Sequence, residues 1–317
     1  MITTRMPLER RLRAVLTAVA SLAAACDRGH HEPPPPAVAT PPAQPAPAKA
    51  CTLAPIPLAV KPTGRVVVVG DLHGDFNAAR DVLRVAGVLD EQGHWSGGST
   101  TLVQTGDVLD RGDGESKILA LLDQLADEAP KAGGQVVQLL GNHELMNGAH
   151  DFRYVTPAGM KDFDGDRTHE LGPSGVWAKK LARHNIVAIV GDTVISHAGV
   201  LPTWTDALDR VNLDARCWLD GQSPEPPAAL TSEESPVWTR DWGGDQVDCA
   251  RLHKVLDALG AKRMVVAHTV QAAGINSQCD GALWRIDVGL SKVYDGPIQA
   301  LELAPELKIL SGTRTGA

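Results

Sequence analysis

The 317-residue sequence predicts an α/β fold, in which a parallel sheet is covered by helices. Short apolar runs that end in polar clusters alternate with segments whose apolar residues recur at helical spacing. Strands that alternate with helices along the chain are typical of parallel sheets, because parallel neighbours need a crossover connection. Ligands of such sheets bind beyond the carboxyl ends of the strands, and the polar clusters lie at those ends.

Three expected strands open the domain, and each runs directly into a short polar motif. They are Arg65–Val69, followed by Gly70-Asp71-Leu72-His73-Gly74; Thr101–Thr105, followed by Gly106-Asp107-Val108-Leu109-Asp110-Arg111-Gly112; and Gln135–Leu140, followed by Gly141-Asn142-His143-Glu144. Two expected helices, Ala78–Ala86 and Lys117–Ala126, separate these strands.

The second half of the chain repeats this pattern with more strand. Residues 186–190 and 193–196 predict a hairpin, and His197 and an Ala-Gly pair follow it. A strand over residues 263–267 ends at His268. Further strands are expected over residues 283–288, 298–303 and 307–310.

Residues 201–248 are rich in Pro and Trp and show little periodicity. They predict an irregular insertion with a few helical turns. Its tryptophans would form either the core of a small cap or an aromatic wall beside a substrate; they are Trp204, Trp218, Trp238 and Trp242.

The N-terminal 25 residues resemble a bacterial lipoprotein signal. Four arginines precede a short apolar segment that ends in small residues before Cys26, and this segment is too short to span a bilayer. Cleavage after Ala25 would leave Cys26 as a lipidated first residue, so we expect an exported, membrane-anchored protein on the periplasmic or cell-surface side. The alternatives are an ordinary secretory signal cleaved nearby and an uncleaved anchor.

Residues 26–60 are expected to form a linker, because much of this segment is Pro and Ala and includes four consecutive prolines. The domain is expected over residues 61–310, followed by a tail over residues 311–317. Four cysteines besides Cys26 allow two disulfides in an oxidising compartment, although four free buried thiols are an alternative; they are Cys51, Cys217, Cys249 and Cys279. The sequence gives neither their pairing nor the oligomeric state.

The formal net charge of the chain is −8, and the first 25 residues carry four Arg against one Glu. The rest of the chain is therefore more acidic than the whole. An acidic body without a basic stripe argues against nucleic acid as a partner.

The polar residues at the strand ends predict a metal centre. Six potential ligands follow the expected strands, namely Asp71, His73, Asp107, Asn142, His197 and His268. Carboxylate, imidazole and amide ligands without thiolate suit divalent ions such as Mn, Fe or Zn. Six ligands exceed the needs of one tetrahedral ion, whereas two ions about 3.5–4 Å apart that share a bridging carboxylate would use them all.

The motifs at Asp71, Asp107 and Asn142 resemble the three signature motifs of calcineurin-like metallophosphoesterases, in the version of the phosphoprotein phosphatase family. His197-Ala-Gly and Ala267-His268 resemble the two later histidine motifs of that family. The resemblance spans roughly residues 64–303 and implies a central β-sandwich flanked by helices (αββα). Within the family, the segments around Asn142–Val155, Val237–Arg240 and Asp287–Ser291 are similar to those of bacterial Shewanella-like phosphatases.

The resemblance also implies roles for the ligands. Asp71 and His73 would hold a first ion, Asp107 would bridge both ions, and the second ion would be held by Asn142, His197 and His268. A hydroxide between the ions would attack phosphorus in line.

The remaining motif residues imply recognition and proton transfer. Arg111 would clamp the phosphate, with Asn142 beside it and Arg240 as a second clamp; the alternative for Arg240 is a surface salt bridge. His143 would donate a proton to the leaving group while Asp110 holds its other ring nitrogen. Glu144 is expected to bond backbone amides.

These observations predict a dimetal phosphomonoesterase that acts on phosphorylated protein or peptide, at Ser/Thr or Tyr phosphate. One alternative is a nucleotide or dinucleotide polyphosphate hydrolase, in which the third motif often ends in Asp where this chain has Glu144. The other alternative is a metal-binding scaffold without activity. Chelator-sensitive release of phosphate, and the substrate that shows it, would separate the three.

Overall fold

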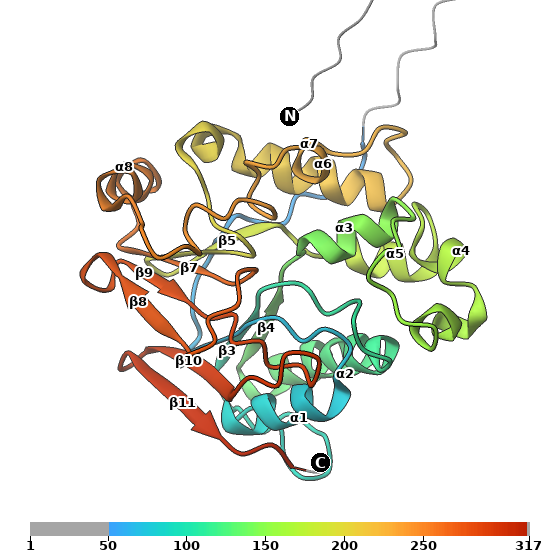
Figure 1. The fold of residues 1–317 in the computed structure, drawn as a ribbon, viewed down its shortest axis with the longest axis horizontal. Coiled ribbons are helices and arrows are strands. Elements are labelled where there is room, and N and C mark those ends of the chain that lie inside the picture. The colour runs from blue at the N-terminus through green and yellow to red at the C-terminus, as the bar shows by residue number, and fades with distance from the viewer. Residues whose placement is uncertain (1–50, 316–317) are drawn as a thin grey trace, which may run out of the picture. The chain divides into compact units, whose positions relative to one another are not determined.

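A computed structural model of the chain describes residues 51–315 (Figure 1). The expected signal segment, Cys26 and most of the expected linker lie outside these residues. Two sheets form the centre of the domain, and helices flank them. The predicted α/β fold with a β-sandwich between helices is therefore confirmed.

The five-stranded sheet contains the three strands expected first along the chain. Its order is β11-β10-β2-β3-β4, with β2, β3 and β4 parallel to one another and β10 antiparallel to β2. These strands span Val66–Val69 (β2), Thr101–Gln104 (β3), Gln135–Gln138 (β4), Ile298–Ala304 (β10) and Lys308–Gly312 (β11).

The six-stranded sheet is formed mainly by the second half of the chain. Its order is β1-β5-β6-β7-β9-β8, and it contains the expected hairpin of β5 and β6. Strands β6, β7 and β9 are parallel neighbours. The strands span Ala59–Val60 (β1), Val187–Val190 (β5), Thr193–Ser196 (β6), Arg263–Val266 (β7), Asn276–Gln278 (β8) and Leu283–Arg285 (β9).

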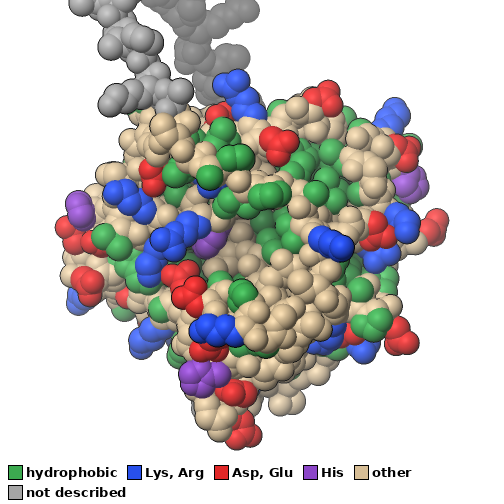
Figure 2. Space-filling model, turned by 180° about the vertical axis from the view of Figure 1, so that it is seen from behind, with side chains coloured by type: hydrophobic (Ala, Val, Ile, Leu, Met, Phe, Trp, Pro, Cys, Tyr) green, Lys and Arg blue, Asp and Glu red, His purple; other side chains and the backbone are tan. Residues whose placement is uncertain are grey.

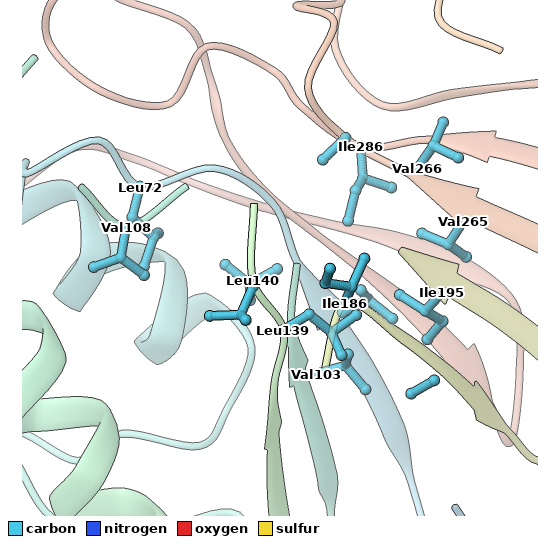
Figure 3. Packing of buried hydrophobic residues seen from close by; sticks show 14 of the residues in the cluster. Leu72, Val103, Val108, Leu139, Leu140, Ile186, Ile195, Val265, Val266 and Ile286 are labelled. Carbon is cyan, nitrogen blue, oxygen red and sulfur yellow. The ribbon is translucent and has the colours of Figure 1, made fainter. Parts of the chain in front are cut away.

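Aliphatic side chains from both sheets form the core between them. Val103 of β3 lies near Ile195 of β6, with Leu139 and Ile186 alongside (Figure 3). Each of these four side chains is at most 2% exposed. Full burial of an aliphatic side chain contributes about 1.5–3 kcal/mol, so this layer fixes how the two sheets meet.

Helices cover both outer faces of the sandwich (Figure 1). Helix α1 packs on β10 and β11, and α2 packs on β4, whereas α6 and α8 lie on the side of the other sheet. The helices span Phe76–Val85 (α1), Glu115–Glu128 (α2), Asn142–Gly148 (α3), Arg167–Leu171 (α4), Val176–Leu181 (α5), Leu208–Leu219 (α6), Ala228–Thr231 (α7) and Cys249–Leu259 (α8).

The expectation of an irregular insertion with a few helical turns over residues 201–248 did not locate its longest helix. Helix α6 runs for 12 residues and buries Leu208, Val211, Ala215 and Leu219 on one face. This spacing is helical, but the polar residues between these positions obscured it. Beyond the insertion, α8 was also missed, although the Asp248 side chain accepts a hydrogen bond from Arg251 N at its start and a Gly with φ 63° ends it.

The expected linker also extends too far into the domain. Residues 59–60 form β1, which pairs with β5, and Thr52 N donates a hydrogen bond to Gln222 Oε1 (2.8 Å). Cys51 forms a disulfide with Cys217, and a second disulfide joins Cys249 to Cys279. The four cysteines, whose pairing the sequence left open, thus form two disulfides, and the first of these joins the segment before β1 to α6.

Lys, Arg, Asp and Glu side chains are interspersed on the face that Figure 2 shows, without a broad stripe of either sign. Within residues 51–315, no helix has both the length and the apolar composition needed to cross a bilayer.

Candidate functional site

Two sets of three parallel strands carry the candidate site. Asp71, Asp107 and Asn142 follow β2, β3 and β4 in one sheet, and His197 and His268 follow β6 and β7 in the other. The carboxyl ends of parallel neighbours lie at the same edge of a sheet, so each sheet presents its residues together. The structure brings all ten sequence-predicted site residues to this region, where most of them line one cavity of about 300 Å³.

The loops at these strand ends adopt an unusual backbone conformation. Left-handed φ values between 42° and 68° occur at His73, Asp107, Asp110, Arg111 and His268. Such values are uncommon for residues other than Gly and cost of order 1–3 kcal/mol each where the conformation is strained. The surrounding contacts must therefore hold these loops in place.

Glu144 supplies several of those contacts. Its buried carboxylate accepts hydrogen bonds from the backbone nitrogens of Gly141 (2.7 Å), Asp107 (2.8 Å), Val108 (2.9 Å) and Leu109 (3.2 Å). The expectation that Glu144 bonds backbone amides is confirmed. It acts from helix α3, however, because Asn142-His143-Glu144 begins that helix rather than lying in a loop.

Gly74 and Gly112 let the loops of the first two motifs pack backbone against backbone. A Cβ atom at Gly74 would lie 2.6 Å from the carbonyl carbon of Gly112, which is closer than real Cβ contacts. Only Gly therefore allows the loop that carries His73 to approach the loop that carries Asp110 and Arg111.

Four ligand atoms converge beside Asp107. His197 Nε2 lies 2.9 Å from Asn142 Oδ1, 3.1 Å from His268 Nδ1 and 3.2 Å from Asp107 Oδ2. Ligand atoms that share an ion at about 2.0–2.2 Å are themselves roughly 3 Å apart, so this spacing fits one divalent cation.

A second group of atoms lies on the other side of Asp107. His73 Nε2 is 3.8 Å from Asp107 Oδ2 and 3.9 Å from Asp71 Oδ2. The other ring nitrogen of His73 lies 3.0 Å from the carbonyl oxygen of Leu109, a hydrogen bond that would orient Nε2 toward the carboxylates. Asp107 is thus the residue that both groups share.

The chemistry of these groups fits metal ions. Asp71 Oδ1, His197 Nδ1 and His268 Nε2 are buried without a hydrogen-bond partner. Burial lowers the pKa of His73 to about 4, and burial together with His197 lowers the pKa of His268 to about 2, so both imidazoles are neutral ligands at neutral pH. These buried His and Asp residues could hold a metal.

The carboxylates of the site repel one another. Burial raises the pKa of Asp71 well above its usual value, and the neighbouring Asp287 and Asp107 raise it further. Burial also raises the pKa of Asp287, which is 2% exposed. Bound cations would relieve this repulsion.

His143 lies beside these groups in a separate hydrogen-bonded pair. Its Nδ1 is 2.5 Å from Asp110 Oδ2, and its backbone nitrogen donates to Asp107 Oδ1 (3.0 Å). Burial lowers the pKa of His143, but Asp107 and Asp110 outweigh that effect and leave its pKa raised. Arg111 Nη2 lies 3.4 Å from His143 Nε2. The ligand atoms of His143, His73 and Asp107 lie within 4.8 Å of one another, so their spacing alone would also allow His143 to contact an ion.

Asp110 belongs to a fully buried ionic network. The guanidinium of Arg167 donates to Asp110 Oδ1 (3.0 Å) and to both carboxylate oxygens of Glu115 (2.5 and 2.7 Å). Asn147 Nδ2 also donates to Asp110 Oδ1 (2.8 Å), so the oxygen opposite His143 is fully occupied. This network fixes Asp110 as the partner of His143.

The two predicted arginines both line the cavity. Arg240 reaches the cavity from the insertion and donates to Thr269 Oγ1 (3.2 Å), and it forms no ion pair with any of residues 51–315. Trp238 lines the same cavity, whereas Trp218 and Trp242 are buried in the core. The insertion thus supplies both a small core and one aromatic wall.

Asp287 and two tyrosines of the cavity were not predicted as site residues. Asp287 follows β9 as the other polar residues follow their strands, but the expected strand over residues 283–288 was too long and placed Asp287 inside it. Tyr154 lies in a segment that was noted for its family resemblance but was given no role, and Tyr294 comes from a loop that gave no signal. Arg167 does not line the cavity, and nothing in the sequence indicated its role, because its partner Asp110 is distant along the chain.

The protein-family model described as "Calcineurin-like phosphoesterase" matches residues 64–272 of the chain. The chain belongs to the calcineurin-like phosphoesterase family. Within it, the chain is 37% identical to Shewanella-like protein phosphatase 2 of Arabidopsis thaliana, over 75% of each chain, and 29% identical to Shewanella-like protein phosphatase 1 of Plasmodium berghei, over 78% of this chain and 77% of that one.

A solved structure of another phosphatase has a similar fold. A mutant of a cold-active protein tyrosine phosphatase superimposes with a TM-score of 0.71 at 25% identity, over 81% of this chain and 83% of that one. This phosphoesterase is therefore a metal-dependent phosphatase of the Shewanella-like group.

Replacing Glu144 by Gln is expected to loosen the phosphoesterase loops. Gln offers one acceptor oxygen and places an NH₂ group against backbone N–H donors, so about half of the hydrogen bonds are lost. Unsatisfied buried donors cost roughly 1–3 kcal/mol. Urea unfolding of the metal-free protein should show that loss, and calorimetry should show weaker Mn²⁺ binding. The exposed Glu91→Gln variant is the control; equal stability of the two variants would contradict the prediction.

Replacing Arg167 by Met is expected to destabilise the domain by roughly 3–5 kcal/mol, because Asp110 and Glu115 would be left buried without their counter-ion. Arg210 is a matched control, since it forms an exposed ion pair with Asp214 (3.2 Å). Arg210→Met should cost less than about 1 kcal/mol. Chemical denaturation measures both, and similar losses in the two variants would show that the buried network contributes no more than a surface pair.

Proposed function

We propose that the protein is a dimetal phosphomonoesterase that removes phosphate from Ser/Thr or Tyr side chains of proteins or peptides. The observation that carries the proposal is one cavity lined by four of the six proposed ligands, by His143 with Asp110 behind it, and by two arginines. The names of the relatives, which are protein phosphatases, support a phosphorylated protein as the substrate.

We assign the ligands as two groups that share Asp107. Asp71 and His73 form the first group, and the second is formed by Asn142, His197 and His268. Their donor set suits Mn, Fe or Zn. Two ions held there would activate a water molecule at neutral pH and offset the charge of the phosphate.

Arg111 and Arg240 are the proposed phosphate clamps, with the Asn142 amide beside them. Both guanidinium groups line the cavity. Their planar forks can each donate two hydrogen bonds to phosphate oxygens, which orients the phosphorus and stabilises the charge that spreads over those oxygens.

His143 is the proposed general acid. Its Nε2 faces the cavity, while Asp110 binds Nδ1 and stabilises the protonated ring. As the bond from phosphorus to the leaving oxygen breaks, that oxygen takes the proton of Nε2. In this assignment the positive charge of Arg111, 3.4 Å from His143 Nε2, disfavours a cation at that nitrogen and leaves His143 for proton transfer.

We also propose that the domain is exported and anchored through a lipid on Cys26. Two disulfides among the described residues support an oxidising compartment. Mass spectrometry of the mature N-terminus tests this proposal: a diacylglyceryl Cys26 is expected, and an unprocessed Met1 would contradict it.

A substrate panel tests the function. The full chain loaded with Mn²⁺ is incubated with p-nitrophenyl phosphate, phosphopeptides and dinucleotide polyphosphates, with and without chelator. Chelator-sensitive release of phosphate from the phosphopeptides is expected. Release only from the polyphosphates, or release from none of the substrates, would overturn the proposal.

His143→Asn is expected to retain Mn²⁺ and lose about 10²–10⁴-fold in kcat, because a general acid contributes that much. The loss should be smaller for p-nitrophenyl phosphate than for phenyl phosphate, since the better leaving group needs less protonation. Bound Mn²⁺ per chain and kcat for both esters are measured, with the exposed His253→Asn variant as the control. Loss of metal from the His143 variant would assign His143 as a ligand instead.

A further inference from the structure

Arg111 lies between the only two tyrosines of the chain. The carbon at the centre of its guanidinium is 4.9 Å from the ring centroid of Tyr154 and 5.2 Å from that of Tyr294. Both rings line the cavity, and they are 43% and 36% exposed. Large aromatic side chains that remain exposed beside a proposed phosphate clamp are positioned to meet the rest of the substrate.

The backbone around both tyrosines is anchored. The carbonyl oxygen of Tyr154 accepts a hydrogen bond from Arg111 N (3.0 Å). Two hydrogen bonds hold the loop of Tyr294. Asp75 Oδ2 accepts one from Lys292 N (2.8 Å), and Arg314 donates the other to the carbonyl oxygen of Leu290 (2.6 Å). The placement of the two rings is therefore determined by the fold rather than by their own contacts alone.

The two rings differ in their nearest histidine. The Tyr154 ring lies 5.2 Å from the ring of His143, the proposed general acid. The Tyr294 ring lies 6.0 Å from the ring of His73, a proposed metal ligand. The leaving oxygen must come within hydrogen-bonding distance of His143 Nε2. Tyr154 is the tyrosine whose ring lies beside His143, so it is placed to contact the group attached to that oxygen.

The chemistry of the leaving group decides what Tyr154 can contribute. Aromatic rings attract one another when their centroids are about 4.5–7 Å apart, in offset or edge-to-face arrangements. A phenyl ring bonded directly to the leaving oxygen falls within that range of Tyr154. The single methylene carbon of a phosphoserine side chain offers no ring and far less apolar area.

We propose that Tyr154 is a specificity-determining residue that favours aryl phosphates, and so phosphotyrosine peptides, over alkyl phosphates. This inference rests on the proposed function. In the step concerned, water oxygen forms the new bond to phosphorus, the bond to the phenolic oxygen breaks, and that oxygen takes the proton from His143. Tyr154 binds the departing ring and does not exchange a proton.

Matched phosphopeptides test the inference. Two peptides of the same sequence, one with phosphotyrosine and one with phosphoserine, are hydrolysed by the full Mn²⁺-loaded chain, and the ratio of their kcat/KM values is compared among variants. Tyr154→Leu should lower the phosphotyrosine to phosphoserine ratio by about 2- to 10-fold, the value expected for one aromatic pair. Tyr154→Phe keeps the ring and should keep the ratio.

Tyr294→Leu is the matched control, because the Tyr294 ring contacts Arg111 from the other side. It should change kcat/KM for both peptides by the same factor. An equal loss on both peptides in Tyr154→Leu, or an equal shift of the ratio in Tyr294→Leu, would overturn the inference.

A binding measurement on the unaltered chain removes any dependence on the folding of a variant. Phenylphosphonate should inhibit hydrolysis of the phosphoserine peptide at a lower concentration than ethylphosphonate. Equal inhibition would overturn the inference, even where the chain is an active phosphatase. Absence of hydrolysis of every phosphopeptide would instead contradict the proposed function.

Discussion

Asp107 places a buried carboxylate, 2% exposed, where the two sheets meet. Its Oδ1 accepts a hydrogen bond from His143 N (3.0 Å), and its Oδ2 lies 3.2 Å from His197 Nε2 and 3.8 Å from His73 Nε2. Burying a carboxylate is costly unless charges and donors surround it. Although burial raises the pKa of Asp107, His197 and His143 outweigh that effect and lower it well below its usual value.

The fold and the site depend on each other through this residue. Asp107 has φ 54°, and Glu144 of the next strand-to-helix connection accepts from its backbone nitrogen. The carboxylate of Glu144 thus ties the end of β3 to the start of α3. Because β2, β3 and β4 run parallel in one sheet and β6, β7 and β9 in the other, packing the two sheets together is what assembles the ligands.

The sequence predicted the parts of the site that follow a local rule. A polar residue directly after an apolar strand identified Asp71, Asp107, Asn142, His197 and His268, and the parallel sheet then required them to lie together. Glu144 was expected only to bond backbone amides, and the structure confirms this. The ends of the strands were also close to those observed, since burial on both faces makes such strands nearly continuous apolar runs.

What the sequence did not predict depends on distant contacts. Arg167 lies far along the chain from Asp110 and Glu115, and no periodicity indicates that a surface-type residue is fully buried between them. Helix α6 was missed because its apolar face is interrupted by polar residues. The pairing of Cys51 with Cys217, over a separation of 166 residues, follows only from the tertiary fold.

The arrangement of charge separates the two tasks of the site. Buried carboxylates and neutral imidazoles gather around Asp107, where they attract cations. Arg167 and Arg111 carry positive charge near Asp110 and His143. A cation is stabilised among the carboxylates and repelled near the arginines. Adjacent residues of one motif can therefore have different roles. Asn142 points toward the metal ligands, whereas His143 pairs with Asp110.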